Sequence, residues 1–116
     1  ANIALYGGPA GAPVGITYAH NWSAKQVIGG VINGASSALY LSALTAVATG
    51  ACGGMSALNA GFFSICDHAY ENQGFAGTGG TSKIAEILIY SGALTNTQIG
   101  QVITYLGAKY GKSIGP

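Results

Sequence analysis

One stretch of this chain, close to its C-terminal end, has the periodicity of an α-helix. Its apolar residues recur at the spacing that places them on one helical face: Ile99, Val102, Ile103, Leu106 and Tyr110. Thr95 with Gln98 three residues later predicts a capping box at the start of the helix. Gly111 favours the left-handed conformation that ends many helices. We therefore expect a single terminal helix that buries one face.

The rest of the chain reads as short strands separated by turns rich in glycine, serine and asparagine. Residues 14–19 alternate between larger apolar and small or polar side chains, which predicts a strand with one buried face. Further strands are expected at residues 27–32, 38–41, 44–49, 62–66 and 83–90, and a long loop over residues 68–82. Residues 83–90 contain few polar positions, so we expect them to form a central strand buried on both faces. Six or more short strands with one helix predict an antiparallel sandwich.

The scarcity of charge restricts the functions open to such a fold. The chain has 116 residues, enough for one domain, and only 6% of them are charged. A net charge of +1 without any arginine argues against nucleic-acid binding, and the apolar runs are too short to span a membrane. A surface of Gly, Ala, Ser, Thr and Asn suits a protein packed against neighbours or located outside the cell. We therefore expect a secreted or assembly-bound protein.

Two segments resemble the concanavalin A-like (laminin-G-like) family of lectin and glucanase modules. Residues 32–41 (INGASSALYL) and 46–50 (AVATG) are similar to a hairpin of that family, although Ser42 and Ala43 stand where its second Asn-Gly turn usually lies. Residues 84–95 (IAEILIYSGALT) and 105–111 (YLGAKYG) are similar to its C-terminal strand and helix. The resemblance implies an all-β, antiparallel two-sheet jelly-roll sandwich with one C-terminal α-helix. The single domain, residues 1–116, would belong to a longer polypeptide or assembly.

Catalysis is not expected from the acidic residues, and we predict no catalytic residue, cofactor or metal. A glycosidase needs two carboxyl groups flanking the scissile bond, whereas Glu86 stands alone and Asp67 and Glu71 lie four residues apart in or near a loop. The sequence leaves open whether a calcium ion binds near Asp67 and Glu71. It also leaves open whether Cys52 and Cys66 form a disulfide or remain two buried thiols.

Glycan binding requires an aromatic platform with nearby amide groups. Two places fit, one with Tyr18, Asn21 and Trp22 and one with Tyr70, Asn72 and Phe75. These six residues are the predicted ligand-binding set.

Because phage tail fibres and head-surface proteins often carry the fold that the resemblance implies, we expect a non-catalytic structural or attachment module of a surface assembly, specifically a phage virion protein of the tail fibre or capsid surface, with a virion or extracellular location. The alternative is a secreted carbohydrate-binding, lectin-like module of an enzyme or adhesin. The expected partners are protein neighbours in a homo-oligomer or virion, with a cell-surface glycan as a further partner.

Overall fold

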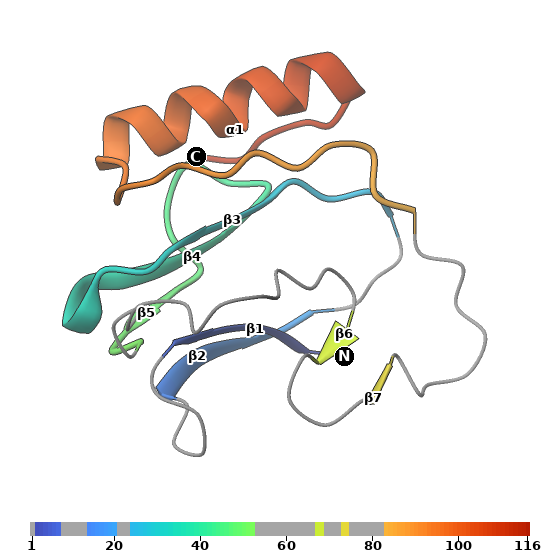
Figure 1. Cartoon of the computed structure of the whole chain (residues 1–116). Helices are drawn as coiled ribbons and strands as arrows, with labels where there is room; N and C mark the ends of the chain where they lie inside the picture. Colours follow the sequence, from blue (N-terminus) through green and yellow to red (C-terminus); the bar gives the residue numbers. More distant parts are fainter. Residues whose placement is uncertain (1, 8–13, 21–23, 53–66, 69–72, 75–82) are drawn as a thin grey trace. The chain divides into compact units, whose positions relative to one another are not determined.

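A computed structural model describes residues 2–7, 14–20, 24–52, 67–68, 73–74 and 83–116 (Figure 1). The chain divides into two compact units, each considered by itself. The first contains Ala1–Ser56 and Tyr90–Pro116, and the second contains Ala57–Ile89. Nearly all of the regular secondary structure described lies in the first unit.

The first unit contains a hairpin, a three-stranded sheet and a helix. Strands β1 (Asn2–Gly7) and β2 (Val14–Ala19) pair antiparallel. Strands β3 (Ile28–Val31), β4 (Ser37–Leu41) and β5 (Ala48–Gly50) form an antiparallel sheet in that order. The short 3₁₀ turn η1 (Gly34–Ser36) joins β3 to β4, and helix α1 spans Asn96–Tyr110.

Strand β4 is the centre of this unit because both of its faces are covered. Tyr40 packs with Val27, Val31, Ile99 and Ile103 in a cluster between the sheet and α1. The neighbouring residues Leu39 and Leu41 instead join Ile3 and Ile16 of the hairpin. Successive side chains of a strand point to opposite faces, so the run Ala-Leu-Tyr-Leu supplies both cores. Helix, sheet and hairpin thus form three layers (Figure 1).

Two polar residues fix the ends of β4. Ser37 is fully buried, and its hydroxyl accepts from the Asn33 N–H at 2.9 Å and donates to the Gly34 carbonyl at 2.8 Å. Ser42 has a positive φ of 47°. Its hydroxyl accepts from the Val27 N–H at 3.0 Å and donates to Gln26 Oε1 at 2.7 Å. These bonds hold an energetically unfavourable backbone conformation in place.

Helix α1 begins and ends as the sequence predicts. The Gln98 N–H donates to Thr95 Oγ1 at 3.3 Å, and the Thr95 N–H donates to Gln98 Oε1 at 2.9 Å, which completes the capping box. Gly111 ends the helix in the left-handed region, with φ of 60°. The chain then returns along the helix and bonds to the loop after β4, where the Leu44 N–H donates to the Gly115 carbonyl at 3.0 Å.

The predicted two-sheet jelly-roll sandwich is wrong. The described residues instead form a small three-stranded antiparallel sheet with the C-terminal helix on one face and a two-stranded hairpin on the other. The helix takes the place that a second broad sheet would need, because its apolar stripe buries one face of β3 and β4. The predicted strands at residues 14–19, 27–32 and 38–41 are confirmed within one or two residues, and the 44–49 strand is shorter and begins later.

The predicted central strand at residues 83–90 is also wrong. This segment has no regular secondary structure, and Ile84, Ile87, Leu88 and Ile89 are exposed. A continuous apolar run is consistent with a buried strand but does not establish one. Among the described strands, β4 is the one covered on both faces. In the second unit, β6 (Asp67–His68) pairs antiparallel with β7 (Gln73–Gly74). The predicted strand at residues 62–66 lies outside the described residues.

Candidate functional site

The exposed face of α1 carries an open hollow of about 580 Å³. One wall is Leu44, which lies in the loop after β4, and the rest of the lining comes from the helix. The helical residues lie at the spacing of one face: Asn96, Thr97, Gly100, Gln101, Thr104 and Tyr105. This face borders the one that Ile99 and Ile103 bury against the sheet, since Asn96 bonds to the buried Tyr40.

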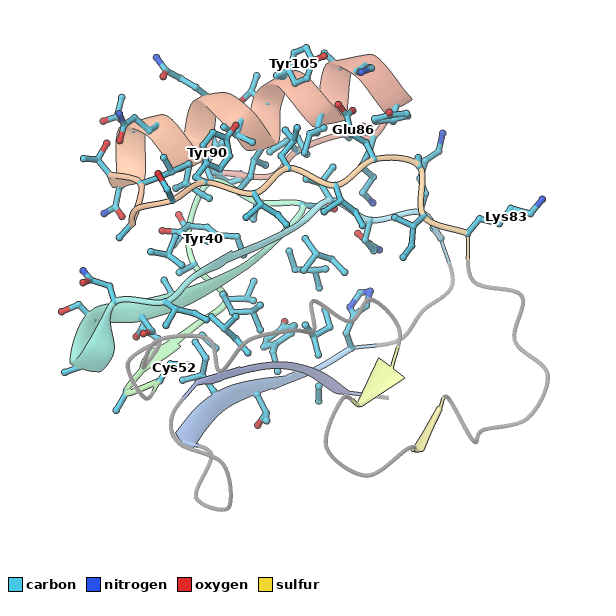
Figure 2. All side chains as sticks on the ribbon, viewed as in Figure 1. Tyr40, Cys52, Lys83, Glu86, Tyr90 and Tyr105 are labelled. Atoms are coloured by element: carbon cyan, nitrogen blue, oxygen red, sulfur yellow. The ribbon has the colours of Figure 1, made fainter. Side chains whose placement is uncertain are left out.

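The lining combines apolar surface with neutral hydrogen-bonding groups. Tyr105 is 53% exposed and Leu44 is 46% exposed, and Figure 2 shows Tyr105 projecting from α1 away from the sheet. Two carboxamides and two hydroxyls complete the lining, and none of its side chains is charged. The Lys109 ammonium lies 5.4 Å from the centroid of the Tyr105 ring, at the distance of a cation–π interaction.

The hollow is anchored to the core at the first turn of α1. The buried Tyr40 of β4 donates its hydroxyl to Asn96 Oδ1 at 3.2 Å. This bond orients the Asn96 side chain and leaves its NH₂ group as a donor. Leu44 is held from the other side by the bond of its N–H to Gly115. A hydrogen bond therefore holds the Asn96 side chain on one wall and the Leu44 backbone on the other.

The two glycines of α1 differ in what surrounds them. A Cβ on Gly107 would lie 2.5 Å from Ile114 Cγ1 and 2.9 Å from the Lys112 carbonyl oxygen, so the returning C-terminal segment requires glycine there. A Cβ on Gly100 would lie 3.7 Å from Leu44 Cδ2, an ordinary van der Waals distance. Glycine destabilises a helix interior by about 1 kcal/mol relative to alanine. At position 100 the packing does not require glycine.

The structure describes only one residue of the predicted ligand-binding set. Tyr18 lies on β2, where it is half-buried against the cluster of Ile3, Ile16, Leu39 and Leu41. The other five lie outside the described residues: Asn21, Trp22, Tyr70, Asn72 and Phe75. Their role in glycan binding remains a prediction. The sequence analysis missed the hollow, although the polar face of the terminal helix, with Tyr105 in it, was the available signal.

The structure describes only some of the cysteines and acidic residues. Cys52 is 1% exposed, has a free thiol and donates from Sγ to the Leu5 carbonyl at 3.4 Å, and burial raises the pKa of this thiol. Cys52 forms no disulfide in this structure. Cys66 and Glu71 lie outside the described residues, so the state of Cys66 and the calcium site near Asp67 remain untested. Within the described ranges, no three His, Cys, Asp or Glu side chains gather as a metal site would require.

A second feature of the first unit is a sheet edge. Strand β3 pairs with β4 on one side, and no other described strand pairs with it on the other. An edge strand presents unpaired N–H and C=O groups that attract another strand. Ile28, at the start of β3, is 48% exposed. This edge therefore combines backbone hydrogen-bonding groups with apolar surface.

Comparison with protein-family models, with curated proteins and with solved structures gives no match to this chain. Within the described residues, no helix has the length and hydropathy needed to cross a membrane.

Proposed function

We propose that this chain is a non-catalytic structural or attachment module of a surface assembly, specifically a phage virion protein of the tail fibre or capsid surface. The proposal rests on one observation: large apolar side chains are exposed on a chain with almost no charge. Between 42% and 68% of each of these side chains is exposed: Ile28, Leu44, Tyr90 and Tyr105 in the first unit, and Ile84, Ile87, Leu88 and Ile89 in the second.

Contact with neighbouring subunits would bury this apolar surface. Fully burying an Ile or Leu side chain contributes about 1.5 to 3 kcal/mol. Burying the exposed half of such a side chain at an interface would therefore contribute about half of that free energy. Charged groups lose hydration when an interface forms, and a chain with 6% charged residues has few of them to desolvate. The open edge of β3 adds backbone hydrogen bonds that a strand of a neighbour would complete.

The test is the oligomeric state of the purified chain, measured by light scattering over a range of concentrations. We expect an oligomer. Ile28→Lys places a charge beside the open edge of β3 and should raise the dissociation constant by about tenfold or more. Ala108→Lys is the matched control, because it adds the same charge at an exposed helical position. A chain that stays monomeric at every concentration contradicts the proposal.

A secreted carbohydrate-binding module is the second candidate function. The hollow on α1 favours it, because an exposed aromatic ring beside neutral amide and hydroxyl groups suits a sugar. A monomeric chain that binds an uncharged glycan would support this candidate over the assembly. A chain that assembles and binds no glycan would exclude it.

A further inference from the structure

Residues 84–90 have the composition of a strand but belong to no described strand. This segment (IAEILIY) is rich in isoleucine and contains a tyrosine, both enriched in strands, and it has no proline. Several of its residues form no backbone–backbone hydrogen bond within the described part of the chain: Ile84, Ile87, Leu88 and Ile89. Between 42% and 68% of each of these side chains is exposed. Extended apolar segments of this kind add readily to an open sheet edge.

Strand β3 offers such an edge. Hydrogen-bonded and non-hydrogen-bonded pairs alternate along an antiparallel ladder. Because the Ser42 N–H donates to the Val27 carbonyl at 2.8 Å, the backbone groups of residue 27 face β4. The N–H and C=O groups of Ile28 and Gly30 therefore point away from β4, and both residues are exposed. Strand β3 contains neither a proline nor a charged residue, which are common protections of a sheet edge.

We propose that residues 84–90 of one copy of the chain pair as a strand with the open edge of β3 in a second copy. Within one chain the two do not pair, because β3 bonds only to β4 among the described strands and residues 84–90 belong to none of the described sheets. This pairing rests on the proposed assembly function and specifies the two surfaces that join the copies.

The two surfaces match in chemistry as well as in hydrogen bonding. Side chains that face each other on adjacent strands have Cβ atoms about 4.5 to 5.5 Å apart, so Ile28, which is 48% exposed, would pack against an apolar side chain of the added segment. Glycine at positions 29 and 30 leaves the rest of the edge without side chains, which lets another backbone approach closely.

The segment and the edge are different surfaces, so the contact is heterologous. Each copy carries one of each. Two copies can therefore exchange segments and close as a dimer, or each copy can bind the next and extend the assembly. In both cases a chain that lacks one surface still has the other, and this property separates the pairing from contact between two identical patches.

The test is complementation between two variants, measured by light scattering and calorimetric titration. Ile28→Lys charges the edge and keeps the segment, whereas Ile87→Lys charges the segment and keeps the edge. Each alone should weaken self-association by about tenfold or more. Their equimolar mixture should form a complex of one copy of each, at concentrations where either variant alone is monomeric. Ala108→Lys, at an exposed position of α1, is the matched control and should assemble like the parent chain.

Disulfide cross-linking is a second measurement and needs no added charge. Chains with Ile28→Cys are mixed with chains carrying Ile87→Cys or Leu88→Cys, in a Cys66→Ala parent whose Cys52 is buried. Successive side chains of a strand point to opposite faces, so one of these two adjacent positions should cross-link to position 28 severalfold more than the other.

Circular dichroism of each variant verifies that α1 is retained. An Ile87→Lys chain that assembles like the parent, or a mixture of the two lysine variants that forms no complex, overturns the inference and leaves the assembly module standing. Equal cross-linking at positions 87 and 88 overturns it as well. So does a disulfide formed within a single Ile28→Cys/Ile87→Cys chain at high dilution, because the segment would then pair with its own edge. A parent chain that is monomeric at every concentration contradicts the proposed function too.

Discussion

Replacing the two glycines of α1 with alanine, one at a time, should change the stability of the first unit in opposite directions. Both substitutions make the same covalent change in the same helix, so both gain about 1 kcal/mol of helix propensity. They differ only in what the new methyl group meets. At Gly100 it would lie 3.7 Å from Leu44 Cδ2, and at Gly107 it would lie 2.5 Å from Ile114 Cγ1.

The magnitudes follow from these distances. Gly100→Ala gains the propensity and an ordinary contact, so it should stabilise the chain by about 1 kcal/mol. Gly107→Ala forces Ile114 and the Lys112 carbonyl to move, since a Cβ would also lie 2.9 Å from that oxygen. Overpacking of this kind costs about 1 to 3 kcal/mol, and contacts below 3 Å with both Ile114 and a backbone oxygen place Gly107→Ala in the upper part of that range, at about 2 to 3 kcal/mol. We expect a net loss of about 1 to 2 kcal/mol.

Urea denaturation followed by circular dichroism measures both effects, and the two variants should differ by about 2 to 3 kcal/mol at a constant m-value. The double variant Gly107→Ala/Ile114→Ala removes the obstructing side chain and should show a favourable coupling of about 1 kcal/mol. If Gly107→Ala stabilises the chain as much as Gly100→Ala does, the returning C-terminal segment does not pack on the helix. The explanation given for the two glycines would then fail.

Three further substitutions test the helix cap, the buried turn and the buried thiol. Thr95→Ala removes the acceptor for the Gln98 N–H and should lower the free energy of unfolding by about 1 kcal/mol. Thr97→Ala, at an exposed position of the same helix, is the control. Equal free energies of unfolding for the two variants in urea denaturation would contradict this prediction. Ser37→Ala removes the acceptor of the Asn33 N–H and one of the two donors to the Gly34 carbonyl, which also accepts from the Cys52 N–H, and it should cost about 1 to 2 kcal/mol in the same assay. Burial raises the pKa of Cys52 above its unfolded value of about 8.5, so its contribution to stability is fully present below that pH and is lost as the pH rises through the folded pKa. Cys52→Ala should therefore show a smaller fall in thermal midpoint between about pH 8 and pH 10 than the parent chain, and equal falls would argue against a buried neutral thiol.

The local elements could be predicted wherever neighbouring residues determine them. The alternation at residues 14–19 depends on contacts within a few positions, and the structure contains the expected strand there. Residues 83–90 could not be placed in the same way. Their apolar run indicated a buried strand, but burial depends on neighbours from distant parts of the sequence.

The hollow could be predicted from the sequence only in part, again because it depends on residues distant in the sequence. The spacing of Asn96, Gln101 and Tyr105 on one helical face is a property of the sequence. That Leu44, more than fifty positions earlier, forms the opposite wall depends on the bond between Leu44 and Gly115. The sequence search for an aromatic platform turned to the loops, because nothing local marks a helical tyrosine as part of a concave surface.

By itself the sequence determined the terminal helix with both of its ends, because the capping box and Gly111 act within one turn of the residues they stabilise. It also determined that the surface would be nearly neutral, since four cationic and three acidic residues are all the chain has. Only the tertiary structure decided that this helix covers a three-stranded sheet, and that Gly107 is required by packing whereas Gly100 is not. The physical reason is that side-chain contacts between distant segments exist only after the backbone has brought those segments together.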